Sequence, residues 1–159
     1  MSQPFDIGLA ADRDVDSIAV MSRDLVESGV DWFWTPNRVR RALRRTDTIV
    51  PVARVGSAMA GFALIRVGFE EAHLDLLAVR PGRRRQGIGR TLVAWLEESV
   101  LVAGVGVVRV RVRTSRPAVQ SFFRSLGYVP RPKPEDAKDS PELPMAHDLW
   151  CPPVVDEVR

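Results

Sequence analysis

Residues 73–90 read HLDLLAVRPGRRRQGIGR and join two kinds of secondary structure through one turn. The apolar run that ends at Val79 is typical of a strand, and Arg80-Pro81-Gly82 is typical of a tight turn. From Ile88 onward, apolar residues recur with helical spacing, which predicts a long helix. The first backbone N–H groups of a helix have no partner inside it, so the start of this helix is a candidate site for a phosphate group.

The residues of the turn strengthen the phosphate prediction. Gly87 and Gly89 have no side chain, so a ligand can approach the backbone closely. Four arginines add positive charge where a pyrophosphate or a 3′-phosphate would lie: Arg83, Arg84, Arg85 and Arg90. A lone Gly-x-Gly is commonly just a turn, and the stretch lacks both the third glycine of the dinucleotide fingerprint and the Gly-Lys-Ser/Thr of the P-loop. The pattern therefore indicates an anion site without naming the anion.

Strand and helix patterns continue on both sides of this stretch. Strands are expected at 5–10, 48–54, 58–67, 72–79, 107–112, 128–129 and 145–150. Helices are expected at about 14–28, from Pro36, from Ile88, and from Pro117 to Gly127, while 130–142 reads as a loop rich in proline and charge. No internal repeat or long linker divides the chain, so we expect one domain over residues 1–150 and a frayed tail over 151–159.

The composition excludes several classes of protein. No apolar run approaches the roughly 18 residues that a membrane helix needs, and Met1–Asp6 is too polar and short for a secretory signal. The single cysteine, Cys151, excludes an internal disulfide and has no evident base partner. No cluster of residues has the spacing of metal ligands. We therefore expect a soluble cytoplasmic protein that binds no membrane and no metal ion.

Arginine dominates the charge of the chain, which has a formal net charge of +3. Lys133 and Lys138 are the only lysines, so arginine supplies nearly all of the positive charge. An excess spread this widely is typical of a solvated surface, except at residues 83–90, where it adjoins the glycines. The chain has no helix-turn-helix signature and no interleaved basic and aromatic stripe, so we expect no nucleic-acid partner.

Two motifs resemble the signatures of the GNAT acetyltransferase superfamily. The first is Gln/Arg-x-x-Gly-x-Gly/Ala after a strand that ends in Val-x-Pro, and it reads Arg84-Arg85-Gln86-Gly87-Ile88-Gly89 after Val79-Arg80-Pro81. The second is an aromatic pair near a helix end, followed by Gly-Phe or Gly-Tyr, and it reads Phe122-Phe123-Arg124-Ser125-Leu126-Gly127-Tyr128. The two motifs stand in the family's order and spacing. The resemblance covers about residues 5–150 and is strongest over 73–128.

The resemblance implies a fold, a cosubstrate and a reaction. The fold would be α/β (α+β mixed), with a central mixed, mostly antiparallel twisted sheet of about seven strands and about four flanking helices. Acetyl-CoA would lie in a V-shaped opening between the strands at 72–79 and 107–112. An amine, on a small molecule or a peptide, would attack the thioester directly, and a backbone N–H near Val79 would polarise the carbonyl. The residues implied to bind the cofactor are Leu77, Ala78, Val79, Arg84, Arg85, Gln86, Gly87, Ile88, Gly89, Arg90, Phe122 and Phe123.

The group that protonates the leaving thiolate is not given by the family pattern. In many members a tyrosine stands at the position of Phe123, which has no proton to give, and the asparagine often found near the start of this helix is Arg116 here. Tyr128, Ser121 or a water molecule remain as candidates for the acid. The missing tyrosine also leaves open a non-catalytic acyl-CoA-binding or regulatory module of the same fold.

The base that takes a proton from the amine is expected on the strand at 72–79. His73 and Asp75 lie two residues apart and so share one strand face, which is expected to carry Leu77 and Val79 as well. This segment resembles the same strand of arylalkylamine acetyltransferases, which carry histidines at both positions. Solvent exposure without a role is the alternative for both residues. Glutamates or aspartates elsewhere are further candidates for the base: Glu70, Glu71, Glu27 and Asp31.

An aromatic run, Trp32-Phe33-Trp34, separates the first two expected helices. In the family this region borders the acceptor site, so the run would suit an apolar acceptor. Core packing or a contact in a homodimer are the alternatives.

Overall fold

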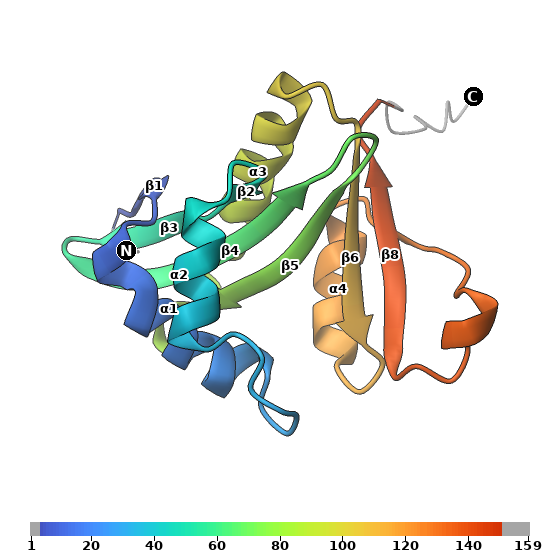
Figure 1. The fold of residues 1–159 in the computed structure, drawn as a ribbon, viewed down its shortest axis with the longest axis horizontal. Helices are drawn as coiled ribbons and strands as arrows, with labels where there is room; N and C mark the ends of the chain where they lie inside the picture. The colour runs from blue at the N-terminus through green and yellow to red at the C-terminus, as the bar shows by residue number, and fades with distance from the viewer. Residues whose placement is uncertain (1–3, 151–159) are drawn as a thin grey trace.

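Eight strands form one sheet in the computed structural model, which describes residues 4–150 (Figure 1). They are β1 (Asp6–Leu9), β2 (Thr48–Ile49), β3 (Pro51–Val55), β4 (Ala58–Val67), β5 (Ala72–Val79), β6 (Val107–Arg113), β7 (Val129–Pro130) and β8 (Glu142–Asp148). The order is β1-β3-β4-β5-β6-β8-β7, and β2 pairs with β4. Only β5 and β6 run parallel, so the predicted mixed, mostly antiparallel sheet is confirmed.

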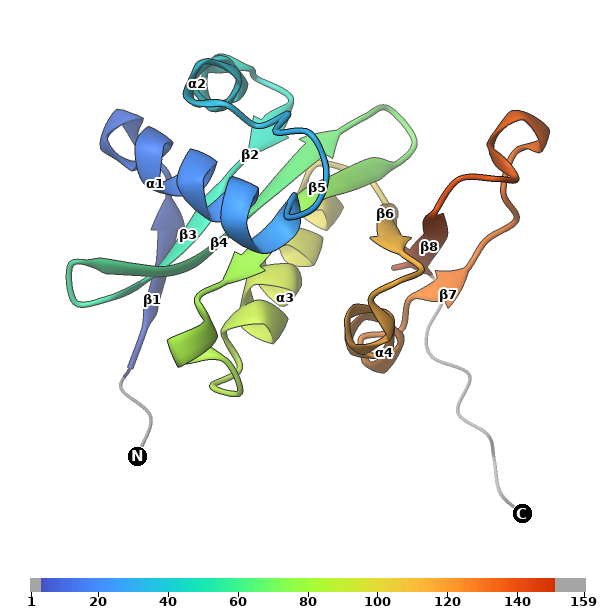
Figure 2. The ribbon, with the colours of Figure 1, turned by 90° about the horizontal axis from the view of Figure 1, so that it is seen from below.

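Helices cover both faces of the sheet. The α-helices are α1 (Val15–Met21), α2 (Pro36–Arg44), α3 (Ile88–Val102) and α4 (Pro117–Ser125). Shorter helical turns are η1 (Asp12–Asp14), η2 (Ser22–Val26), η3 (Pro81–Arg83) and η4 (Glu135–Ala137). Figure 2 shows α1 and α2 on one face and α3 and α4 on the other. Within residues 4–150, no helix is long and apolar enough to cross a membrane.

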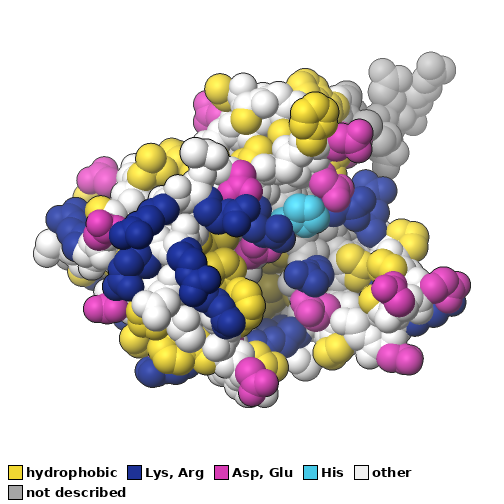
Figure 3. Space-filling view, viewed as in Figure 1, with side chains coloured by type: hydrophobic (Ala, Val, Ile, Leu, Met, Phe, Trp, Pro, Cys, Tyr) yellow, Lys and Arg dark blue, Asp and Glu magenta, His cyan; other side chains and the backbone are white. Residues whose placement is uncertain are grey.

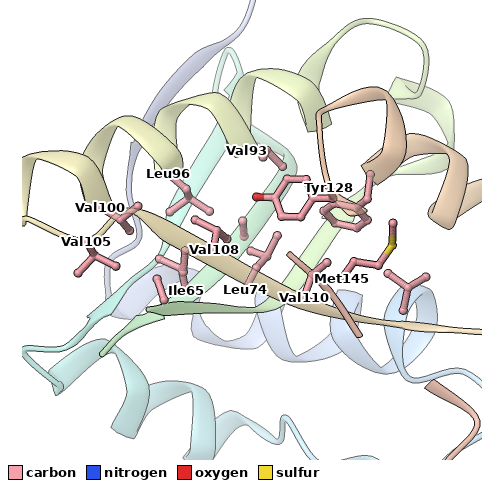
Figure 4. Close-up of a cluster of buried hydrophobic side chains, with 14 residues drawn as sticks. Ile65, Leu74, Val93, Leu96, Val100, Val105, Val108, Val110, Tyr128 and Met145 are labelled. Atoms are coloured by element: carbon pink, nitrogen blue, oxygen red, sulfur yellow. The ribbon is translucent and has the colours of Figure 1, made fainter. Parts of the chain in front are cut away.

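Alternation along β4 fills a core on each face. Phe62 and Leu64 pack with the side chains of α1 and α2, whereas Ala63 and Ile65 pack with those of α3 and α4. The core on the side of α3 and α4 also includes buried residues of β5, β6 and β8, and Figure 4 shows this core beneath α3. Because successive strand side chains point to opposite faces, a strand that is apolar throughout must be covered on both.

Several boundaries differ from those expected. The expected strand at 48–54 is divided into β2 and β3, and Pro51, which cannot donate a ladder hydrogen bond, begins the second part. The first helix is divided into η1, α1 and η2 and ends at Val26. The last strand was expected at 145–150 but runs over Glu142–Asp148, because it pairs along the whole of β6. The predicted tail, 151–159, lies outside the described residues.

Candidate active site

The parallel strands β5 and β6 separate along their length. They pair only where Ala72–Leu74 faces Val108–Val110, and Figure 1 shows them diverging beyond that point. A cavity of about 790 Å³ lies between the diverging segments and is lined by both strands, by η2 and by the segment that follows η2. The V-shaped opening implied by the resemblance is therefore present, and it begins just after Leu74.

A β-bulge at Asp75 divides β5 into two parts that face opposite ways. Leu76 is paired with Leu64 and Leu74 with Ile65, so Asp75 is the extra residue on its strand. Leu74 packs with the α3 core, but Leu76 packs with the core of α1 and α2. The bulge thus reverses the alternation within one residue.

The bulge corrects the prediction that four residues of β5 share a face. His73 and Asp75 lie on the α1 and α2 side, but Leu77 and Val79 pack on the α3 side, against the cluster that contains Ile88. Simple alternation fails because the extra residue advances the strand by one position without a partner on β4. Leu77 still lines the cavity, whereas Val79 does not.

Asp75 lines the cavity and is held in a fixed orientation. Its carboxylate accepts two hydrogen bonds from the guanidinium of Arg66, one of them from Nη2 at 3.2 Å. The Asp75 side chain is only 13% exposed, so it lies in the wall of the cavity rather than in bulk solvent. A carboxylate placed this way can accept a proton from a bound amine through water.

His73 lies outside the cavity. It faces Arg109 at the closed end of the opening, and its Nε2 is 3.5 Å from the carboxylate of Glu71, which also pairs with Arg109. The structure therefore brings Asp75 to the opening and leaves His73 in a surface cluster of charges. Of the other candidates, Glu70 and Glu71 do not line the cavity either.

Glu27 and Asp31 line the same cavity from the opposite side. Glu27 is 9% exposed, and its carboxylate accepts hydrogen bonds from the backbone N–H groups of Phe33 at 2.8 Å and of Trp34 at 3.3 Å. Glu27 thereby fixes the aromatic run as part of the cavity wall, with Trp34 also packed on the α1 core. Sequence reasoning ranked Glu27 only among the further candidates, because nothing local shows that it turns inward.

Two arginines tie η2 to the far wall of the cavity. Arg116, at the position of the family's asparagine, donates hydrogen bonds to the Leu25 carbonyl and to Ser28 Oγ, both at 2.9 Å. Arg113, at the end of β6, donates to the carbonyls of Val26 and Ser28. Burial, with the nearby positive charge of Arg113, lowers the pKa of Arg116 from its ordinary value. Arg116 therefore has a structural role here.

The glycine loop has the backbone geometry expected of an anion site. Gly87 precedes α3 with a φ of +78°, and Arg85 also has a positive φ, +64°. A Cβ on Gly87 would meet nothing within 4 Å, so the space beside this backbone is open to a ligand. Gly89 differs, because its Cβ would lie 3.3 Å from the ring of Phe122. Gly87 is thus needed for its conformation and Gly89 for close packing.

The side chains of the loop are arranged for an anion as well. Arg84, Arg85 and Arg90 are exposed, whereas Gln86 is half-buried. The Oε1 atom of Gln86 is buried without a hydrogen-bond partner in the described chain. The loop therefore offers exposed guanidinium groups together with the free N–H groups of a 15-residue helix.

Phe123 and Tyr128 lie on different sides of the cavity wall. Phe123 lines the cavity, and its ring packs edge-on against Phe122 and Tyr128, with centroid distances of 5.1 and 5.2 Å. Tyr128 does not line the cavity and is 1% exposed, and Figure 4 shows it in the core near Val93 and Leu96. Its hydroxyl has no hydrogen-bond partner within residues 4–150, and burial raises its pKa. The structure does not bring Tyr128 to Asp75.

Among residues 4–150, no three His, Cys, Asp or Glu side chains are placed to hold a metal ion.

Comparison with known proteins places the chain in a family. The model of the acetyltransferase (GNAT) domain matches residues 19–149. The [ribosomal protein bS18]-alanine N-acetyltransferase of Escherichia coli K12 is 39% identical over 70 residues, which are 44% of this chain and 47% of that protein. The chain thus matches about half the length of these relatives. N-alpha-acetyltransferase RimI of Mycobacterium tuberculosis is 30% identical over 131 residues, 80% of each protein.

The fold is that of solved acetyltransferases. The PaiA N-acetyltransferase of Thermoplasma acidophilum, solved in complex with coenzyme A, superposes with a TM-score of 0.81 over 91% of this chain and 99% of that chain, at 16% identity. With the family model matching most of the sequence and the fold agreeing, the chain belongs to the GNAT acetyltransferase family.

Proposed function

We propose that this protein transfers the acetyl group of acetyl-CoA to an amine by direct attack in a ternary complex. The observation that carries the proposal is the cavity between β5 and β6, with the carboxylate of Asp75 at the point where the strands separate. The start of α3 follows β5 directly, so an anion site adjoins the opening. The relatives are named as N-acetyltransferases, which supports the same reaction.

The residues of the loop fit coenzyme A. Its pyrophosphate would accept hydrogen bonds from the backbone N–H groups between Arg85 and Arg90, where Gly87 leaves open space. The exposed side chain of Arg84 would add positive charge. The pantetheine arm would lie along Leu77–Val79, and the rings of Phe122 and Phe123 would border it.

The proposed reaction moves one acetyl group and two protons. The neutral amine nitrogen forms a bond to the acetyl carbonyl carbon, and the carbon–sulfur bond breaks. Before the attack, one proton of the ammonium passes through water to Asp75 and then to solvent. After the attack, the nitrogen loses a second proton, which passes through water to the leaving thiolate. A backbone N–H near the bulge and Val79 would stabilise the developing oxyanion. Tyr128 has no part in this sequence, because its hydroxyl is buried away from the cavity.

A peptide amine is the acceptor best supported. The E. coli relative is named for an alanine of a ribosomal protein, and the mycobacterial relative is named as an N-alpha-acetyltransferase. A small alkylamine remains the alternative acceptor. A cytoplasmic location and a homodimer stay predictions of the sequence.

Release of free thiol from acetyl-CoA distinguishes a catalytic acetyltransferase from a non-catalytic acyl-CoA-binding module. Purified protein is incubated with acetyl-CoA and a panel of alkylamines and short peptides with free N-termini, and free thiol is measured. We expect amine-dependent thiol release, with the acetylated amine found by mass spectrometry. Binding of acetyl-CoA without any amine-dependent release would favour the regulatory module that the absence of tyrosine at position 123 suggests.

The substitution Phe123→Tyr tests whether a tyrosine at this position can serve as the acid that protonates the leaving thiolate. Phe123 is 3% exposed but lines the cavity, so we expect a hydroxyl on its ring to be directed into the cavity rather than into the apolar core. We expect unchanged or higher turnover and a change in unfolding free energy of less than about 1 kcal/mol, measured in urea. A large loss of turnover in a stable variant would show that the edge-on packing of Phe123 against Phe122 and Tyr128 is needed for activity.

A further inference from the structure

A second groove lies beside the cavity, over α2. It has a volume of about 310 Å³ and shares Phe33, Trp34 and Arg66 with the cavity. Four arginines line it, and we call it the arginine groove: Arg38, Arg41, Arg45 and Arg66. The two hollows therefore lie side by side, and a molecule in the cavity that is longer than a small amine would cross the shared residues to reach the arginine groove.

The arginines of α2 fall on two different stripes of the helix. Arg38 and Arg41 are spaced i and i+3 on α2, so they lie on one face, and Arg45 follows the last residue of the helix; all three line the groove. Arg40 and Arg44 lie four residues apart on another stripe and do not line it. No Asp or Glu occurs between residues 32 and 46, and Figure 3 shows basic side chains gathered over α2.

The groove keeps positive charge that its own neighbours do not neutralise. Arg45 pairs with Asp47 at 2.9 Å, and Arg66 pairs with Asp75. Arg38 donates to the Phe33 carbonyl at 2.8 Å and lies over the Phe33 ring, 4.2 Å from its centroid, and neither contact cancels its charge. Within the described residues Arg38 and Arg41 have no ion pair. Two guanidinium groups are therefore available to an anionic partner.

We propose that the arginine groove binds the carboxylates of a peptide whose N-terminal amine reacts in the cavity, so that the protein selects acceptors with acidic residues after the first positions. The proposal rests on the proposed function. Arginine forms two parallel hydrogen bonds to a carboxylate, which gives geometric selection as well as attraction. A nucleic acid also carries anions, but it has no alkylamine to place in the adjoining cavity. A peptide supplies both groups on one extended chain.

The test uses three hexapeptide amides that begin with alanine and differ only at the third to fifth positions. These positions carry glutamate, glutamine or lysine, and thiol release is measured against peptide concentration. We expect a KM for the glutamate peptide about tenfold below that for the glutamine peptide, and weaker use of the lysine peptide. The difference should shrink as salt is added, because exposed charges are screened.

Two charge-reversing substitutions on α2 distinguish peptide binding in the arginine groove from attraction by the overall positive charge of the protein. Arg41→Glu should raise the KM for the glutamate peptide about tenfold and change that for the glutamine peptide little. Arg44→Glu makes the same change of charge on an exposed position outside the groove, and it should shift either KM less than about twofold. Equal effects of the two variants would overturn the proposal.

Other outcomes separate this inference from the proposed function. Equal KM values for the three peptides, or turnover of a small alkylamine without turnover of any peptide, would overturn the inference and leave acetyl transfer in place. A short RNA is added as a competitor, and its inhibition of glutamate-peptide acetylation is compared with that by the acetylated glutamate peptide. If the RNA inhibited more strongly and Arg41→Glu removed that inhibition, the groove would be assigned to nucleic acid and the inference would be overturned. If no amine of any kind is acetylated, the proposed function fails and the inference fails with it.

Discussion

Coenzyme A should raise the melting temperature of the parent protein and should not raise that of Gly87→Glu. A ligand at 100 times its Kd stabilises a protein by about 2.7 kcal/mol, which corresponds to roughly 5–10 °C for a chain of this size. In the variant, a carboxylate occupies the open space beside the start of α3, where the pyrophosphate would lie. Like charges then repel, and the shift disappears.

The fold itself should survive this substitution. A Cβ on Gly87 meets nothing within 4 Å, so the cost is the strain of a φ of +78°, about 1–2 kcal/mol. Gly87→Asn is the control for that strain, because asparagine adopts left-handed backbone more readily and adds no charge. Gly82→Glu is the control for charge, since Gly82 lies in the same loop with equally open space and no positive φ. Gly89→Glu is less informative, because it also presses on Phe122.

Differential scanning fluorimetry over a titration of coenzyme A measures these shifts. Gly82→Glu should keep most of the shift and Gly87→Asn part of it. A folded Gly87→Glu variant with the parental affinity would show that the anion is bound elsewhere, and the proposed function would lose its cosubstrate site.

Asp75→Asn should lower turnover by about 10²–10⁴-fold, the usual contribution of a positioned base. The substitution keeps the size of the side chain and one acceptor for Arg66, but it removes the group that takes the proton. The sequence gives His73 the same expectation as Asp75. The structure separates them, because His73 lies outside the cavity, and we expect His73→Ala to keep nearly parental turnover.

The pH dependence distinguishes a base from a residue that only shapes the cavity. The amine must lose a proton before it attacks, and an α-amino group has a pKa of about 8. Below that pH most of the amine is protonated and needs a base, so the defect of Asp75→Asn should be largest there. Above it the amine is already neutral, and the defect should shrink. Single-turnover kinetics from pH 6 to pH 9 measures the rate of acetyl transfer in the parent and in Asp75→Asn. The affinity for coenzyme A is checked at each pH.

A defect of constant size at every pH would give Asp75 a positioning role. Parental rates in both Asp75→Asn and His73→Ala would remove both residues from the mechanism. The base would then be sought at Glu27 or Asp31, which line the same cavity.

Local patterns were enough to predict the glycine loop before α3 and most of the elements around it. The turn at Arg80–Gly82, the positive φ at Gly87 and the helix from Ile88 all follow from the conformational freedom of glycine and from helical spacing. The strands β4 and β5 were also predicted, from their apolar runs, but their pairing was not. These features depend on residues close together in the sequence.

The identity of the residues that face the cavity was decided by tertiary structure. The bulge at Asp75 lies where β5 pairs with β4 but no longer with β6, and an extra residue in one strand leaves no mark in its composition. It moves Leu77 and Val79 to the face opposite Asp75. The sequence alone determined that a strand leads through a glycine loop into the start of a long helix. Only the pairing of distant strands decided which side chains meet where that strand opens, because register is set by partners that lie far away in the chain.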